Sequence, residues 1–188
     1  ACVMAQQVLG GHGYVAEWGL EQNVRDARIA QIYEGANGVQ ALDLMGRKTV
    51  RANGELLALL SEEMDAFVAS QAGVPAMQSY LVSLATCRKV LSDATLFVID
   101  SAASNPEEIG AASYAYMELM GLTLYCFMWQ RILAAALADK GGDNAEYLDG
   151  LVKVGEFFLA RQVPRVHSLL AEIEAGSESL MAMAANQF

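Results

Sequence analysis

Glu34 is the residue whose surroundings in the sequence best suit acid–base chemistry. It follows Ile32 and Tyr33 and precedes Gly35. Apolar neighbours keep water away from a carboxylate, which suits a general base that takes a proton from a weakly acidic C–H group. The glycine would let a ligand approach the backbone closely. On this local context alone, the commoner interpretation is a solvated glutamate before a turn.

Two other short groups of residues could take part in chemistry. Residues 10–13 contain three glycines around His12, and the backbone N–H groups of such a turn can bind a phosphate or pyrophosphate. The turn does not follow a predicted strand, so it is not a dinucleotide fingerprint of the Rossmann type. Arg25, Asp26 and Arg28 place two guanidinium groups beside a carboxylate. The favoured interpretation is an ion pair that pins the loop leading to Glu34.

The composition excludes several classes of partner. The net charge of −10 argues against nucleic acid and against an anionic membrane surface, because both repel an acidic protein. The two histidines and three cysteines lack ligand spacing, so no metal site is expected. Cys2, Cys87 and Cys126 are interpreted as reduced thiols, and we expect a cytoplasmic protein. Only 18% of the residues are charged, which predicts an apolar face that packs against something outside this chain.

The elements that must position these residues are expected to be helices. The chain is rich in Ala, Leu, Met and Glu and has only three prolines, which predicts an all-α protein. In the first part we expect a helix up to Gly10, a connection, a short helix over 21–27, an irregular passage over 29–35, and a helix from Asn37, its N-cap, to about Arg47. The chain starts without Met in a helical pattern, which is typical of a fragment of a longer protein.

Four longer segments with helical spacing follow. They are expected over 49–72, 77–104, 107–140, and from 144 onward with a kink at Pro164; glycines at 141 and 142 should break the third from the fourth. Glu118, Gln130 and Arg131 interrupt the apolar stretch of the third segment, so a buried core helix is expected rather than a membrane span. The pattern predicts an up-down helical bundle, with domains at 1–48 and 49–188.

Three motifs together resemble the acyl-CoA dehydrogenase family. Residues 7–14 match its pattern Q-x-x-G-G-x-G-Y, residues 25–29 match R-D-A-R-I, and residues 32–35 match I-Y-E-G, with Val39 and Gln40 at the closing I-Q. Order, spacing and identity agree over 1–48. Residues 37–48 look most like the long bacterial branch that includes 3-methylmercaptopropionyl-CoA dehydrogenase, whose members carry an extra C-terminal helical domain.

The resemblance implies roles for particular residues. Glu34 would remove the α-proton of an acyl-CoA thioester while FAD accepts the β-hydride, and its backbone N–H would polarise the thioester carbonyl beside Gly35. Gln7, Gly10 and Gly11 would contact the FAD of a neighbouring subunit. The family further implies a homo-oligomer, a dimer or tetramer, and an electron-transfer flavoprotein as partner.

Two departures from the family pattern limit these expectations. Ala36 stands where the family often has a Thr whose hydroxyl reaches the flavin phosphates. Without this hydroxyl one hydrogen bond is missing, which should weaken cofactor binding by about 1 kcal/mol. The family's N-terminal helical domain and β-domain have no counterpart here, so this chain alone is expected to be inactive and free of flavin. The alternatives are a helical oligomerisation or interaction module without activity of its own, or an acyl-CoA oxidase-like relative.

Overall fold

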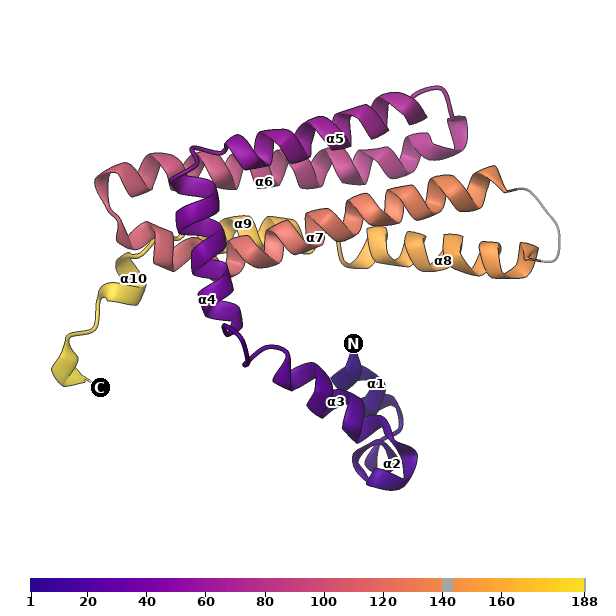
Figure 1. Ribbon diagram of the computed structural model, residues 1–188, viewed down its shortest axis with the longest axis horizontal. Helices are drawn as coiled ribbons and strands as arrows, with labels where there is room; N and C mark the ends of the chain where they lie inside the picture. Colours follow the sequence, from indigo (N-terminus) through magenta and orange to yellow (C-terminus); the bar gives the residue numbers. More distant parts are fainter. Residues whose placement is uncertain (140–143, 188) are drawn as a thin grey trace. The chain divides into compact units, whose positions relative to one another are not determined.

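The chain folds entirely into helices and their connections over the residues that the structure describes. The computed structural model describes residues 1–139 and 144–187, and it contains no strand within these ranges, which confirms the all-α prediction (Figure 1). It divides into two compact units, Ala1–Gln40 and Ala41–Phe188. The division falls before residue 48 because Ala41, Met45 and Thr49 are buried within the second unit. The domain boundary expected at 48/49 stays a prediction.

The first unit consists of short helices joined by glycine turns. They are α1 (Cys2–Val8), α2 (Gly11–Tyr14), the 3-10 helix η1 (Ala16–Trp18) and α3 (Leu20–Ile29). α1 packs against α2 and α3. The packing of α2 on α1 requires Gly13, because a Cβ atom there would lie 2.2 Å from the backbone oxygen of Gln6. α3 is longer than the expected 21–27, since Gly19 with φ of 74° starts it directly at Leu20.

The helix after Glu34 changes its type along its length. It begins as α4 (Asn37–Leu42), with Asn37 as its first residue, and continues as the π-helix η2 (Asp43–Val50). The expected single α-helix to Arg47 is therefore wrong in its second half. The wider turn has a side-chain partner: the Thr49 hydroxyl donates to the backbone oxygen of Leu44 at 2.9 Å. Met45 and Thr49 are 0% and 4% exposed, so η2 is anchored in the core of the second unit.

The longer helices of the second unit form an up-down bundle, which short helical turns accompany (Figure 1), and the helices after η2 follow in chain order. They are α5 (Glu55–Gln71), η3 (Pro75–Met77), α6 (Gln78–Ser104), α7 (Glu107–Ala138), α8 (Ala145–Arg161), α9 (Arg165–Glu174), α10 (Glu178–Met181) and η4 (Ala185–Gln187). α5 begins six residues later than expected, because Asn53 and Gly54 both take positive φ angles and form a turn. The predicted break at 141–142 lies outside the described residues.

Pro164 lies between two separate helices, α8 and α9, and not within one kinked helix. Residues 162–164 form a turn that separates α8 from α9, and Pro164 precedes the first residue of α9. Proline has no N–H to continue the hydrogen bonding of α8, whereas its fixed φ suits the start of a helix. Two helices with a turn between them therefore replace the expected kinked helix.

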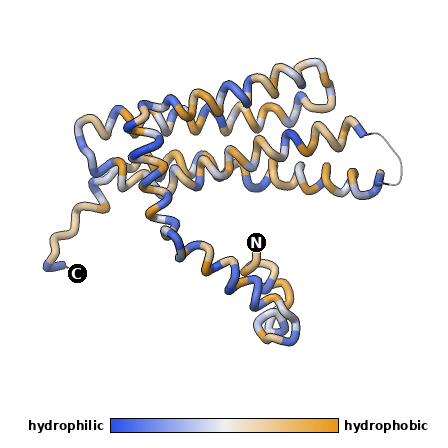
Figure 2. The backbone as a smooth tube through the Cα atoms, in the orientation of Figure 1, coloured by the Kyte–Doolittle hydropathy of each residue, from blue (hydrophilic) through white to orange (hydrophobic). Residues whose placement is uncertain are grey.

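The core of the second unit is built around α7. This helix packs against α6, α8, α9 and η2, and it contributes Tyr116, Leu119 and Leu133, each 0% exposed. Figure 2 shows hydrophobic positions recurring along each bundle helix. By length and composition α7 is apolar enough to cross a membrane, and 44% of its most apolar window is buried inside the protein. Its packing on several neighbours supports the interpretation as a core helix.

A buried hydroxyl pair links α6 to α7. The Tyr116 hydroxyl donates to Thr95 Oγ1 at 2.7 Å, and the Thr95 hydroxyl in turn donates to the backbone oxygen of Leu91 at 2.7 Å. Burial raises the pKa of Tyr116, and the hydrogen bond with Thr95 opposes this rise only in part. Both hydroxyl donors are thus satisfied within the core, as buried polar groups require.

A second polar cluster ties the C-terminal turn to the turn between α6 and α7. Glu108 accepts hydrogen bonds from the Ser177 hydroxyl at 2.6 Å, the Ser177 N–H at 3.2 Å and Asn105 Nδ2 at 3.0 Å. Ser177 is 4% exposed. Hydrogen bonding from Ser177 lowers the pKa of the Glu108 carboxyl below its ordinary value. These bonds hold the start of α10 against the start of α7.

Ser177→Ala is expected to destabilise the protein by about 2 kcal/mol at pH 7, because two hydrogen bonds are lost: the charge-assisted bond that the Ser177 hydroxyl donates to Glu108 and the bond that it accepts from Asn105 Nδ2. Since the pKa of Glu108 is lowered in the folded state, its contribution is present above the unfolded pKa and is lost as the pH falls through the folded value. The destabilisation should therefore shrink on acidification below about pH 4.5. Urea unfolding at pH 7 and pH 4 measures this, with the exposed Ser168→Ala as the control. An effect that is the same at both pH values would contradict the role of Glu108.

Candidate functional site

Glu34 lies in a loop that connects α3 to α4. The loop starts with turns in which Ile32 N–H and Tyr33 N–H donate to the backbone oxygen of Ile29, at 3.0 and 3.1 Å. Its two ends are joined by a hydrogen bond from Asn37 N–H to the backbone oxygen of Gln31, 3.1 Å long. Glu34 is therefore held in a loop whose two ends are joined by a hydrogen bond. Most of this loop lies within the irregular passage that was expected over 29–35.

The backbone at Glu34 is in a left-handed conformation. Its φ angle is 50°, and that of Gly35 is 93°. This conformation costs a residue with a Cβ atom about 1–2 kcal/mol, whereas glycine adopts it freely. Strain of this kind persists where surrounding contacts hold it, and it is concentrated at functional sites. The candidate base is thus one of two described non-glycine residues with positive φ, the other being Asn53.

The side chain of Gln40 contacts the loop from the first turns of α4. Its Nε2 donates to the backbone oxygen of Glu34 at 3.4 Å. A Cβ atom on Gly35 would lie 2.7 Å from the same nitrogen and would displace the amide, and the φ of 93° at Gly35 itself favours glycine. We expected no role for Gln40 beyond its place in the family motif. The signal in the sequence was its position at the closing I-Q of that motif.

The carboxylate of Glu34 is open to solvent within the described chain. Its apolar neighbours Ile32 and Tyr33 are themselves 51% and 53% exposed. The expectation that these two side chains would shield the carboxylate is therefore wrong for this chain taken by itself. An exposed apolar pair beside an exposed carboxylate would be covered only when another surface or a ligand packs on the loop.

Gln7, Gly10 and Gly11 lie around the turn between α1 and α2. Gly10 has a φ of 56° and its N–H donates to the backbone oxygen of Gln7 at 3.0 Å. A Cβ atom on Gly10 or Gly11 would meet no atom within 4 Å, so the backbone here is open to a group from outside. Gln7 is exposed as well. These residues therefore fit a role in holding a polar cofactor edge, as the FAD hypothesis requires.

The glycine turn and Glu34 lie in different parts of the first unit, the turn between α1 and α2 and the loop between α3 and α4. No hydrogen bond or ion pair joins Gln7, Gly10 or Gly11 to the loop at 30–36 among the described residues. The ring of His12 contacts Trp18 edge to face, with 5.2 Å between centroids, which fits a turn residue.

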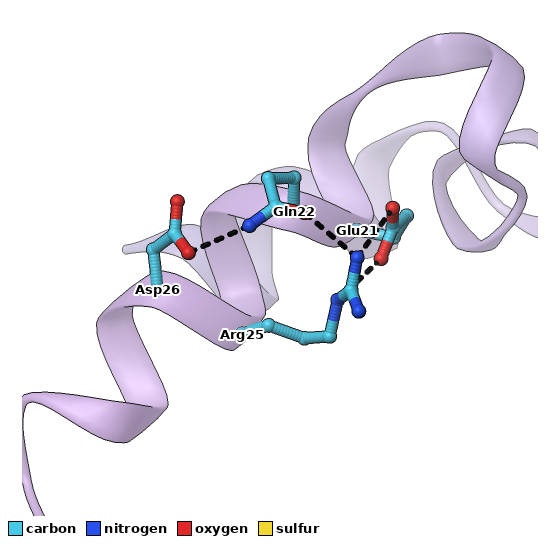
Figure 3. Close-up of polar contacts among 4 residues, drawn as sticks. All are labelled: Glu21, Gln22, Arg25 and Asp26. Carbon is cyan, nitrogen blue, oxygen red and sulfur yellow. Dashed lines mark hydrogen bonds and ion pairs between the residues drawn. The ribbon is translucent and has the colours of Figure 1, made fainter.

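The expected ion pair between Arg25 and Asp26 is wrong. Arg25 Nε lies 2.8 Å from Glu21 Oε2, and Arg25 also donates to Gln22 Oε1 at 2.7 Å, while Asp26 accepts from Gln22 Nε2 at 2.7 Å (Figure 3). Residues three or four apart face each other on a helix, whereas adjacent ones do not. Arg25 and Asp26 therefore stabilise α3 internally.

Arg28 is the arginine that reaches the loop. Its guanidinium donates to Gln31 Oε1 at 2.9 Å, next to the hydrogen bond that closes the base of the loop. The expected link between this arginine-rich segment and the Glu34 loop is thus made by Arg28 and Gln31. No group of three or more His, Cys, Asp or Glu side chains in the described ranges could hold a metal ion.

Two family models together match most of this chain. The model described as "Acyl-CoA dehydrogenase, C-terminal domain" matches residues 1–49, and the model described as "Acetyl-CoA dehydrogenase C-terminal like" matches residues 60–184. The loop that carries Glu34 and the helical bundle thus each match a C-terminal domain model of the acyl-CoA dehydrogenases. The chain belongs to the acyl-CoA dehydrogenase family.

Curated relatives are similar over most of the chain. The broad-specificity linear acyl-CoA dehydrogenase FadE5 of Mycobacterium tuberculosis is 31% identical over 93% of this chain and 30% of its own length. The 3-methylmercaptopropionyl-CoA dehydrogenase of Ruegeria pomeroyi is 34% identical over 84% of this chain and 27% of its own length. The short-chain specific acyl-CoA dehydrogenase of Bos taurus is 52% identical over 22% of this chain and 10% of its own length.

These matches confirm the resemblance that the motifs predicted, including its long bacterial branch. The chain spans 30% and 27% of the length of the first two relatives. The higher identity of the bovine enzyme over 42 residues shows that part of the similarity is concentrated in a short segment.

Proposed function

We propose that this chain supplies the catalytic base of an FAD-dependent acyl-CoA dehydrogenase that converts an acyl-CoA thioester to the 2,3-enoyl-CoA. The observation that supports it is Glu34 itself. It stands at the I-Y-E-G position of a family-matched segment, on a loop closed at its base, in a strained left-handed conformation. In this role Glu34 touches the reacting atoms, and Gly35 leaves room for the substrate.

The reaction needs a base and an oxyanion partner from this loop. Glu34 takes the proton as the Cα–H bond breaks, and the electron pair forms the new double bond to the β-carbon. Bound FAD would supply the acceptor for the hydride that leaves the β-carbon. The N–H of Glu34 has no backbone hydrogen-bond partner among the described residues, so it is free to donate to the thioester carbonyl oxygen.

The glycine turn would hold the cofactor. Gln7, Gly10 and Gly11 would contact the FAD of a neighbouring subunit in a homo-oligomer, a dimer or tetramer, because their backbone is open and separate from Glu34. Ala36 offers no hydroxyl for a flavin phosphate. An electron-transfer flavoprotein would reoxidise the enzyme, and the three free cysteines support a cytoplasmic location.

Acyl-CoA thioesters added anaerobically to the FAD-loaded protein that contains this segment are expected to bleach the flavin absorbance. Several chain lengths are needed, since most of an acyl pocket would lie outside these residues. The segment purified alone serves as the control and should be colourless and inert, because the exposed Glu34 loop lacks a covering surface. A yellow segment, or a loaded protein that no thioester bleaches, would count against the proposal. Rapid reoxidation by oxygen would instead favour an oxidase.

A second role, in helical packing, is favoured by a specific observation. Tyr125 on α7 and Val154 and Phe157 on α8 are 64%, 53% and 62% exposed, although the helices that carry them are core elements. The ring of Tyr125 lies 6.4 Å from the ring of Phe158 on α8, so the exposed side chains come from neighbouring helices, and adjoining exposed apolar side chains can form an interaction surface. This role is compatible with the catalytic one, because it concerns the bundle and not the Glu34 loop.

A further inference from the structure

Gln40 is the only side chain that the described structure places in a hydrogen bond with the backbone of Glu34. The bond runs from Gln40 Nε2 to the Glu34 oxygen, 3.4 Å away, across the turn between the loop and α4. The backbone of Gln40 is fixed in the helix start, since its N–H donates to the oxygen of Ala36 at 3.1 Å. The donor is therefore attached to a rigid element, while its acceptor belongs to the candidate base.

The end of the Gln40 side chain lies directly beside the backbone of Gly35. Gly35 turns with a φ of 93°, and a Cβ atom there would lie 2.7 Å from Gln40 Nε2 and 3.7 Å from Cδ. Glu34 and Gly35 both have positive φ angles, and in this conformation Gln40 Nε2 can reach the backbone oxygen of Glu34. Conversely, the amide is the contact that opposes relaxation of the Glu34 peptide toward an unstrained φ.

From this arrangement we infer that Gln40 is a positioning residue for the base, resting on the proposed function of Glu34. Its amide donates to the Glu34 carbonyl oxygen and so restrains the backbone from which the Glu34 side chain extends. Gln40 does not itself touch the reacting atoms. Arg28 and Asn37 stabilise the base of the loop, whereas Gln40 fixes its tip.

Gln40→Met tests this inference, because methionine has a similar length and no N–H donor. In the FAD-loaded protein we expect the limiting rate of anaerobic flavin reduction to fall about tenfold, equivalent to about 1.4 kcal/mol. The Kd for the acyl-CoA thioester should change less than about twofold, since the loop orients a proton transfer and not the bound CoA. Amide hydrogen exchange in residues 33–36 should become faster. Gln162→Met, in the turn between α8 and α9 and without a side-chain hydrogen bond among the described residues, is the matched control and should change none of these.

A double variant separates positioning from a general loss of structure. Gly35→Ala pushes the Gln40 amide away, so Gln40→Met should slow the reaction less than about twofold in the Gly35→Ala background. Independent, multiplying effects of the two substitutions would overturn the inference. So would a Gln40→Met protein that reduces its flavin at the unaltered rate while Glu34→Gln is inert. If Glu34→Gln itself keeps the full rate, the proposed function fails, and this inference fails with it.

Discussion

Glu34→Gln is expected to slow anaerobic reduction of the flavin by an acyl-CoA thioester by about a thousandfold. Proton transfer by a positioned general base contributes on the order of 10²–10⁴ in rate. The amide keeps the size of the side chain but cannot accept the α-proton at neutral pH. The backbone N–H that would polarise the thioester carbonyl is unchanged, so the remaining rate reports what that N–H and binding contribute alone.

The measurement is stopped-flow absorbance of the FAD-loaded protein at saturating thioester. Glu17→Gln is a suitable control, because Glu17 is an exposed glutamate on η1, away from the Glu34 loop. FAD content and thioester Kd should match those of the unaltered protein, which excludes misfolding as the cause. A Glu34→Gln protein that holds FAD and is reduced at the unaltered rate would show that another group is the base.

Much of the fold could be predicted from the sequence because local signals agree with the final packing. α6 and α7 fall within a few residues of their expected ranges, since their ends are set by Pro75 and Pro106, and proline acts through its own backbone. The π-helix η2 could not be predicted in this way. Its wider turn depends on burial of Met45 and Thr49 against α6 and α7, a tertiary contact that residues 43–50 do not encode by themselves.

The candidate site also has some features that the sequence predicts and others that depend on the folded structure. Glu34 could be proposed as the base because an ordered motif surrounds it, although its local context alone favoured a solvated residue. Its left-handed φ, and the contact with Gln40 that accompanies it, depend on the three-dimensional course of the loop. The pairing of Arg25 was mispredicted for a related reason: the nearest carboxylate in the sequence, Asp26, lies on another side of the helix, and Glu21 lies within reach.

Tyr116→Ala is expected to destabilise the second unit by about 3–5 kcal/mol, the range for removing a large buried side chain. Tyr116 is the largest fully buried side chain of the described residues, and it lies between α6 and α7. Domains are stable by only about 5–15 kcal/mol, so this loss would remove a large share of the folding free energy. In a protein of this size each kcal/mol lowers Tm by about 2–4 °C, so a loss of about 3–5 kcal/mol predicts a drop of roughly 6–20 °C.

Tyr116→Phe separates packing from hydrogen bonding at the same position. The ring remains, and the Thr95 hydroxyl still donates to the backbone oxygen of Leu91, so no buried donor is left without a partner. We therefore expect a loss of only about 1 kcal/mol. Tyr147→Ala, at a tyrosine that is 67% exposed, should change stability by less than about 0.5 kcal/mol.

Urea unfolding of the three variants, followed by tryptophan fluorescence and circular dichroism, measures these differences. An unchanged slope of free energy against urea would show that the same surface unfolds in each case. The loss should be largest for Tyr116→Ala, smaller for Tyr116→Phe and smallest for Tyr147→Ala, because packing at the α6–α7 interface supplies most of the stabilisation and the hydroxyl pair adds less. If removal of the phenolic hydroxyl alone accounted for most of the loss, the Thr95–Tyr116 hydrogen bond would instead be the main link between the two helices.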